Sequence, residues 1–472
     1  MEMGAADFIT KPYNPTIVRC RVKNVMARME NEWRKLEQAA RERQILEMRH
    51  HIEIDALTGV YNREAFYEKT VELLQQNRSV RYNILYFDIN CFKIINDLFH
   101  IETGNLILKT AGTYFKTITE GIGVAAHMEA DHFAICMPED MLDIDILLEG
   151  IDSAIFSLGI KNNILFYAGI YPVDDVLVPV NQMCDRAHMA LNTVKGLYKK
   201  RYAYYDEKMR ETLLEEQMLL REMEQALSSG QFCVYYQPIY SIKAGRAVSA
   251  EALVRWRHPT AGVIPPVRFV PLFERNGFVV RLDRFAWEEV CRMLAERIRA
   301  GLPVVPVSVN VSRLNFYDND FCDTVVGLLQ KYGLDPSLLR LEITESAYTD
   351  NPVQLLSVLK RLHDIGLTIL MDDFGSGYSS LNMLKNVTVD ILKIDMGFVQ
   401  NLEDSERAPT ILRRVVEMAH DLKMSVVVEG VETKAQIDFL SSIDCDKIQG
   451  YYFAKPMARE DFTALIEKEA GR

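Results

Sequence analysis

The sequence lacks the features of several classes of protein. Its eight cysteines are dispersed over 472 residues and no two form a C-x-x-C pair, which argues against a zinc site or a disulfide framework. It has no excess of basic residues, and a net charge of −12 disfavours a protein that coats nucleic acid. No apolar run reaches the length of a membrane span, and the N-terminus has no signal-peptide pattern. We therefore expect a cytoplasmic protein that binds neither nucleic acid nor a membrane.

The length exceeds that of one ordinary domain, and the sequence changes character twice along the chain. We expect an N-terminal helical segment over residues 1–53, an α/β domain over 54–208 and a larger α/β domain over 209–472. In the middle domain, residues 83–89 and 164–171 are predicted strands, and residues 121–137 are a predicted hairpin.

The N-terminal segment reads as the end of a larger domain followed by a helix. Apolar residues lie on one helical stripe: Ile17, Val18, Val22, Val25, Met26 and Met29. Lys11 and Pro12 resemble the pair after the last strand of a response-regulator receiver domain, with an unrelated helical leader as the alternative. Residues 30–51 are rich in Arg, Glu and Gln, which predicts a long helix that is either a short coiled coil or a solvated single helix.

The C-terminal domain repeats a β-branched strand, a polar loop and an amphipathic helix. The expected strands span residues 304–311, 339–344, 367–371, 391–394, 425–428 and 447–450. This alternation predicts a parallel sheet. About 240 residues with this many units favour a (β/α)₈-type, TIM-like barrel over an open sheet.

Polar residues gather where these strands end. They are Glu251, Asn310, Glu342, Asp372, Asp373, Lys393 and Glu429. Because the carboxyl ends of parallel barrel strands open on one face, we expect them to converge on one pocket. Carboxylates packed together repel, and divalent cations with oxygen ligands relieve the repulsion. Adjacent Asp372 and Asp373 suit two ions that together promote the in-line displacement of a phosphodiester.

The same positions carry a resemblance to a known family. The sequence Glu251-Ala252-Leu253, followed by Arg255-Trp256, resembles the signature of the EAL family. Further matching segments are 236–239, 310–312, 342–346, 372–380, 393–395, 429–432 and 449–451. The resemblance covers residues 231–465. It implies a barrel that hydrolyses cyclic di-GMP to linear pGpG with two Mg²⁺ or Mn²⁺ ions.

The resemblance also implies roles for individual residues. It places Glu251, Asn310, Glu342 and Asp372 at one ion, and Asp372, Asp373 and Glu429 at the other. It puts Lys393 beside the attacking water, which Glu429 would help to activate. It assigns substrate contacts to Gln237, Leu253 and Arg255, and supporting contacts to Gln449 and Glu432. It implies that Glu345 braces the loop after Asp373, whose position is coupled to dimerisation in this family.

The middle domain resembles GGDEF domains, which make cyclic di-GMP from two GTP. The resemblance rests on residues 55–63, 87–90 and 93–97. The signature hairpin departs from the family, because Glu129-Ala130-Asp131-His132-Phe133 stands in place of Gly-Gly-Asp-Glu-Phe. Further departures lie at 100–101 and 105, and the family's product-inhibition motif is missing at 120–123.

These departures predict a domain without cyclase activity. Glu129 and Ala130 add side chains where two glycines let a tight turn approach a triphosphate. His132 replaces a carboxylate that the family needs, and we expect it to be a surface residue. Asp88 and Asn96 remain, which leaves weak GTP binding open. We interpret the domain as a folded dimerisation or relay module.

The leading hypothesis is an active cyclic di-GMP phosphodiesterase that works as a homodimer, with the preceding domain as regulator. The first alternative is a receptor that binds cyclic di-GMP without hydrolysing it. The second is a phosphodiesterase for another cyclic dinucleotide.

Overall fold

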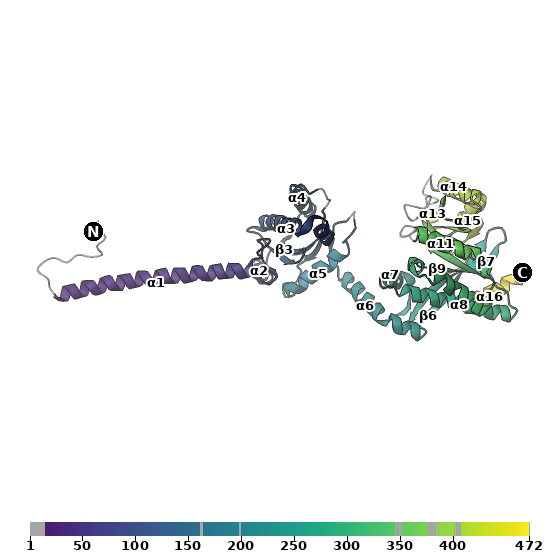
Figure 1. Cartoon of the computed structure of the whole chain (residues 1–472), viewed down its shortest axis with the longest axis horizontal. Helices are drawn as coiled ribbons and strands as arrows, with labels where there is room; N and C mark the ends of the chain where they lie inside the picture. Colours follow the sequence, from purple (N-terminus) through teal and green to yellow (C-terminus); the bar gives the residue numbers. More distant parts are fainter. Residues whose placement is uncertain are drawn as a thin grey trace. The chain divides into compact units, whose positions relative to one another are not determined.

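The structure is a computed structural model, and Figure 1 shows the order of its elements. It describes residues 15–160, 164–197, 200–344, 347, 352–375, 384–385, 387–400, 402 and 407–471. The receiver-like segment with Lys11 and Pro12, and also Glu345, lie outside the described residues. The chain divides into two compact units, Met1–Leu213 and Leu214–Arg472.

The first described element is one helix, α1 (Pro15–Glu53), which includes the helix expected over residues 30–51. Its apolar side chains at Val22, Met26, Met29 and Trp33 are exposed. The structure contains one chain, so the choice between a coiled coil and a single helix stays a prediction. Over the described part of the chain, no helix is long and apolar enough to cross a membrane.

The rest of the first unit is built on a five-stranded sheet in the order β2-β3-β1-β4-β5. Its strands are β1 (Tyr82–Ile89), β2 (Val124–Glu129), β3 (His132–Pro138), β4 (Phe166–Pro172) and β5 (Tyr202–Tyr204). Every residue of β1 is buried, because helices cover both faces of the sheet. On one face lie α3 (Phe92–Thr119) and α4 (Ile144–Phe156), and on the other lie α2 (Arg63–Gln76) and α5 (Val180–Asn192).

The second unit contains a closed barrel of eight strands. Around the barrel these are β6 (Phe232–Ser241), β14 (Lys447–Ile448), β13 (Ser425–Val428), β12 (Ile391–Ile394), β11 (Thr368–Phe374), β10 (Leu339–Thr344), β9 (Val307–Val311) and β7 (Arg246–His258). A short strand, β8 (Gly262–Ile264), pairs with β7 outside the ring. The (β/α)₈-type fold that the sequence predicts is therefore confirmed.

One strand departs from the expected parallel arrangement. The first strand, β6, runs antiparallel to both of its neighbours, β7 and β14. The turn between Ser241 and Arg246 is too short for a crossover helix, and two strands joined in this way form an antiparallel hairpin. As a result, the N-terminal end of β6 lies beside the C-terminal end of β7, since Cys233 pairs with Arg255.

Helices cover the barrel and supply the outer part of its core. They are the C-terminal part of α6 (Glu207–Ser228), then α7 (Pro266–Asn276), α8 (Val279–Arg299), α9 (Phe321–Tyr332), α11 (Pro352–Asp364), α13 (Gly397–Gln400), α14 (Ala408–Asp421), α15 (Lys434–Ser442) and α16 (Arg459–Ala470). Apolar strand residues such as Leu341, Ile343 and Val426 pack in the main core of this unit. Burial of this apolar surface is the main source of the stability of the barrel.

Candidate active site

The polar residues at the strand ends are held in place by the alternation of side chains along each strand. In β10, Leu341 and Ile343 belong to the hydrophobic core, so Glu342 between them points to the opposite face, into the barrel. The parallel pairing sets Glu342 beside Asn310 of β9 and Thr344 beside Asp372 of β11. Residues that are far apart in the sequence therefore meet at one end of the barrel.

Lys393 lies at the centre of this site. Its side chain is 1% exposed, and Nζ lies within ion-pair distance of four carboxylates. The distances are 2.7 Å to Glu429 Oε1, 2.8 Å to Glu342 Oε2, 2.9 Å to Asp372 Oδ1 and 3.1 Å to Glu251 Oε2. One buried ammonium therefore offsets only part of the negative charge that surrounds it.

The pKa values reflect this excess of negative charge. Burial raises the pKa of Glu342 well above its ordinary value, and the neighbouring Glu251 raises it further. Burial also raises the pKa of Glu429 to about 7. Burial acts to lower the pKa of Lys393, but the carboxylates, Asp372 foremost, raise it well above its ordinary value. Added positive charge would stabilise this arrangement.

The carboxylates form two groups whose oxygens are close enough to share an ion. Glu251, Glu342 and Asp372 make one group, and Asp372, Asp373 and Glu429 make the other. Within each group the ligand oxygens lie within 4.8 Å of one another. Asp372 belongs to both groups, as a carboxylate that bridges two ions would. Glu342 Oε1 is buried without a hydrogen-bond partner among the described residues, so it has a lone pair to offer.

Three amide side chains line the same pocket. Asn310 Nδ2 donates to Glu251 Oε1 at 3.1 Å. Gln449 Nε2 donates to Glu251 Oε2 at 2.7 Å and to Gln237 Oε1 at 3.1 Å. Gln237 Nε2 in turn donates to the carbonyl of Ala454 at 3.4 Å. Neutral donors and Lys393 therefore hold Glu251 together. Burial acts to raise the pKa of Glu251, but Lys393 and the amide donors lower it below its ordinary value.

The backbone is left-handed where two strands leave the barrel. Asp373, next to last in β11, has a φ of 56°, which is uncommon for a residue with a Cβ. Burial and the charge of Asp372 raise the pKa of Asp373 to about 6. Gly430, directly after Glu429, has a φ of 70°, and a Cβ there would lie 2.4 Å from Met396 Cβ. These turns direct the two carboxylates of the second group.

The remaining predicted contacts lie in different surroundings. Leu253 and Arg255 are partly buried on β7, and the Arg255 guanidinium lies over the ring of Tyr235, 5.8 Å from its centroid. Glu432 is exposed, and its backbone N–H donates to Gln436 Oε1. Of the predicted site residues, only Glu345 falls outside the part that the structure describes.

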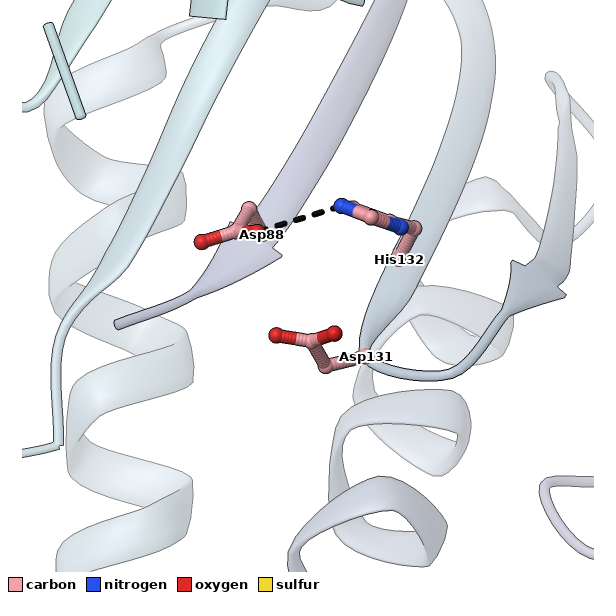
Figure 2. A group of neighbouring side chains, drawn as sticks. All are labelled: Asp88, Asp131 and His132. Carbon is pink, nitrogen blue, oxygen red and sulfur yellow. Dashed lines mark ion pairs between the residues drawn. The ribbon is translucent and has the colours of Figure 1, made fainter. Parts of the chain in front are cut away.

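In the first unit, the hairpin with the altered signature differs from the prediction at His132. His132 is not a surface residue: its side chain is 19% exposed and its Nε2 lies 3.1 Å from Asp88 Oδ2, as Figure 2 shows. Lys195 Nζ approaches the same oxygen to 2.5 Å. Asp131 lies beside this pair, and burial and the charge of Asp88 raise its pKa. The prediction was wrong because β3 begins at His132 and turns the side chain towards β1.

β2 and β3 form an antiparallel hairpin, as the sequence predicts. Ala130 adopts a φ of 51°, a conformation that favours glycine. Glu129 forms an ion pair of 3.1 Å with Arg63, which begins α2. The two added side chains therefore fit a folded domain.

Sequence reasoning missed a polar group behind the barrel wall. Asp283 of α8 is buried and accepts hydrogen bonds from Ser312 N at 2.9 Å and from Asn315 Nδ2 at 2.7 Å. Trp287, one turn further along α8, donates from Nε1 to the carbonyl of Asn310 at 3.0 Å. A single acidic residue within an amphipathic helix gives no signal that it contacts a site.

Two parts of the chain match known protein families. Residues 220–456 match the family described as EAL domain, and residues 52–200 match the diguanylate cyclase, GGDEF domain. The chain belongs to the EAL domain family. The barrel is its EAL domain, and a GGDEF domain precedes it. Phosphodiesterases of the EAL family use divalent metal ions.

Two relatives of this EAL protein have names that refer to cyclic di-GMP. The cyclic di-GMP phosphodiesterase NbdA of Pseudomonas aeruginosa is 32% identical over 428 residues, which cover 88% of this chain and 54% of that protein. The bifunctional diguanylate cyclase/cyclic di-GMP phosphodiesterase MucR of the same organism is 30% identical over 422 residues, with coverages of 87% and 61%. The chain thus spans little more than half the length of these curated relatives.

A solved structure described as PaMucR phosphodiesterase in a c-di-GMP complex is 36% identical. It covers 52% of this chain and 99% of its own, with a TM-score of 0.50.

Proposed function

We propose that the EAL domain hydrolyses cyclic di-GMP to linear pGpG with two divalent ions, Mg²⁺ or Mn²⁺. The observation that carries the proposal is the pair of carboxylate groups that share Asp372 beside Lys393. The names of NbdA and MucR support the choice of substrate.

The donor set fits the ions. Hard divalent cations prefer carboxylate and amide oxygens, and this site offers both. Glu251, Asn310, Glu342 and Asp372 would hold one ion, and Asp372, Asp373 and Glu429 the other. Bound ions supply positive charge that balances the carboxylates and makes a neighbouring water a better nucleophile.

The chain's own residues would manage the proton and the charge of the reaction. Glu429, whose Oε1 lies 2.7 Å from Lys393 Nζ, would help to activate the attacking water by accepting a proton from it. Lys393 stays protonated among its carboxylates and would place a fixed positive charge beside the attacking water. Both groups are held by their neighbours, since Lys393 Nζ lies 2.7 Å from Glu429 Oε1 and 2.8 Å from Glu342 Oε2.

Substrate contacts would come from the rim of the barrel. Arg255, from the end of β7, suits a phosphate oxygen, because a guanidinium binds such oxygens through paired donors. Leu253, Gln237 and Gln449 would complete the substrate pocket, with Gln449 already bonded to Gln237 and Glu251. Glu432 and Glu345 would support the loops around it.

The GGDEF domain would act as a regulatory or dimerisation module that does not make cyclic di-GMP. Lys195 and His132 both lie against Asp88 Oδ2, an oxygen that a cyclase would offer to a metal ion. We further propose that the protein works as a homodimer, and that any binding of GTP at this domain is weak.

The test is a turnover assay with the whole chain, cyclic di-GMP and Mn²⁺ or Mg²⁺, with linear pGpG as the measured product. We expect product from the wild type and at least a 100-fold loss in Glu251→Ala and Asp372→Asn, which change the carboxylates of the site. Binding of cyclic di-GMP without product would contradict the proposal and support the receptor alternative. Preferred hydrolysis of a different cyclic dinucleotide would contradict the assigned substrate.

A matching assay with GTP tests the proposed role of the GGDEF domain. The Glu251→Ala variant, which cannot destroy the product, is incubated with GTP and Mg²⁺. We expect no cyclic di-GMP. Its accumulation would show that the altered hairpin still supports synthesis.

A further inference from the structure

Asp283 is a buried carboxylate that belongs to none of the groups described for the active site. It lies in the first part of α8 and is 8% exposed. A carboxylate so far from water has to be satisfied by hydrogen bonds. Both of its donors, Ser312 N and Asn315 Nδ2, come from the segment that follows β9. Asp283 therefore binds one short segment behind the barrel, through the backbone of Ser312 and the side chain of Asn315.

That segment carries Asn310. Ser312 comes two residues after Asn310, at the start of the 3₁₀ turn Arg313–Tyr317. The carbonyl of Asn310 itself accepts the indole N–H of Trp287. Asp283 and Trp287 are one helical turn apart on α8, so they lie on the same face of the helix. One face of α8 thus holds the backbone at Asn310 and at Ser312.

On the side of β9 that faces β7, the backbone needs these partners because the sheet no longer supplies them, although β10 still pairs with β9 at Asn310. The pairing between β7 and β9 ends at Val309, and Asn310 and Ser312 lie beyond it. Backbone groups at the end of a buried strand require other partners. The side chains of α8 provide them at this point. On the other side of the same backbone, Asn310 Nδ2 reaches Glu251 Oε1 inside the barrel.

We infer that Asp283, together with Trp287, is a positioning residue that fixes residues 310–312 and thereby holds the Asn310 amide at the ion site. The inference rests on the proposed function, because it gives the Asn310 amide an ion to bind. The competing explanation is that Asp283 only caps the turn after β9 and supports the fold. The two explanations differ in what happens to ion affinity when the fold is intact.

The first pair of variants separates hydrogen bonding from size. Asp283→Leu removes the acceptor and keeps the branched shape of the side chain, whereas Asp283→Asn keeps a carbonyl oxygen for both donors. We expect Asp283→Leu to weaken Mn²⁺ binding to the whole chain at least tenfold, measured by calorimetry, and to lower kcat more than it raises KM. We expect Asp283→Asn to stay within about threefold of the wild type in both measurements.

A second pair avoids any change in the buried helix. Ser312 has a φ of −63°, the value that proline adopts, so Ser312→Pro suits the backbone conformation. It removes the N–H donor and places Cδ where Asp283 Oδ2 now accepts that hydrogen, which breaks this contact. Ser312→Ala removes only the hydroxyl and serves as the matched control. We expect Ser312→Pro to weaken Mn²⁺ binding at least fivefold relative to Ser312→Ala.

A local spectroscopic signal reports on the backbone directly. The chain has three tryptophans, and ¹⁵N-indole labelling gives each its own resonance. Trp287 Nε1 reports on the Asn310 carbonyl, whereas Trp256 Nε1 donates to Gln231 Oε1 elsewhere in the barrel and reports on the fold. We expect the Trp287 resonance to move in Asp283→Leu and in Ser312→Pro, while the Trp256 resonance stays in place.

The outcomes decide between the explanations. Wild-type Mn²⁺ affinity in Asp283→Leu and Ser312→Pro, with both proteins folded, would overturn the inference, and so would a wild type that binds no Mn²⁺. A wild type that binds Mn²⁺ but hydrolyses no cyclic di-GMP would overturn the proposed function alone. In that case the comparison of affinities still decides whether Asp283 positions Asn310.

Discussion

At the scale of single residues, the active site depends on an imbalance of charge. One ammonium, Lys393 Nζ, faces four carboxylates at distances of 2.7 to 3.1 Å. A buried ionised group without a partner costs several kcal/mol, so neither partner can be removed cheaply. The same imbalance that makes the site costly to fold would favour the binding of added cations.

We predict that Lys393→Met destabilises the ion-free protein by about 3 to 5 kcal/mol, because it leaves buried carboxylates uncompensated. Adding Mg²⁺ should recover part of the loss, while turnover should stay at least 100-fold below that of the wild type. Urea unfolding with EDTA and with Mg²⁺ measures the stability. The control is Lys447→Met, since Nζ of this partly buried lysine donates to Ser425 Oγ, and its effect should not depend on Mg²⁺. Equal losses in both variants would contradict the prediction.

Asp283 leads to a prediction about pH. Burial raises its pKa from 3.8 to about 7, so the folded protein holds a proton there that the unfolded chain releases above pH 3.8. This group therefore contributes stability below pH 3.8 that is lost as the pH rises through about 7. Asp283→Asn removes the titration. Relative to the variant, the wild type should lose up to about 4 kcal/mol between pH 4 and pH 8, measured by urea unfolding. Parallel pH profiles would show that the carboxyl does not titrate in this range.

At the scale of elements, the sequence was a good guide where the apolar residues of a strand alternate or follow one another. The predicted bounds of β10, β12 and β13 agree with the structure. β6 was not among the expected strands, although the short turn closed by Gly245 predicts a hairpin with β7.

The sequence predicts which residues gather in the site, but it does not predict which of them contact one another. Polar residues at strand ends must face one end of a barrel, which follows from topology alone. Whether Lys393 meets four carboxylates or two depends on distances across the barrel, which packing sets. Asp283 was missed because it reaches the site only through the backbone of its neighbours.

The turn after β13 yields a prediction of its own. Gly430→Ala places a Cβ 2.4 Å from Met396 Cβ and should displace Glu429, with about a 100-fold loss of turnover. Gly277→Ala is the matched control, because its φ of 80° is just as strained for alanine while no atom lies within 4 Å of the new Cβ. The control should lose about 1 kcal/mol of stability and keep full turnover. Similar turnover in the two variants would show that Glu429 does not depend on this turn.

At the scale of the whole molecule, the chain forms two compact units, and the proposed ion site lies within the second. The effect of ions on stability can therefore be measured from the unfolding of that unit. Mn²⁺ at 100 times its Kd should stabilise the EAL domain by about 2.7 kcal/mol. Fluorescence of the buried Trp256 and Trp287 follows this domain during unfolding in urea. In Asp372→Asn, which changes the carboxylate shared by both groups, the gain should fall below about 1 kcal/mol. An equal gain in that variant would place the ions elsewhere.

The antiparallel direction of β6 decides at which end of the barrel the chain enters, relative to the candidate site. In an all-parallel barrel, the polypeptide would enter at the end remote from the catalytic groups. Here α6 ends at Ser228, β6 begins at Phe232, and β6 starts at the rim where β7 ends. Along the chain, Tyr235 and Gln237 therefore follow α6 by only a few residues, before β6 has crossed the barrel. The start of β6 and the proposed substrate contacts therefore lie at the same end of the barrel.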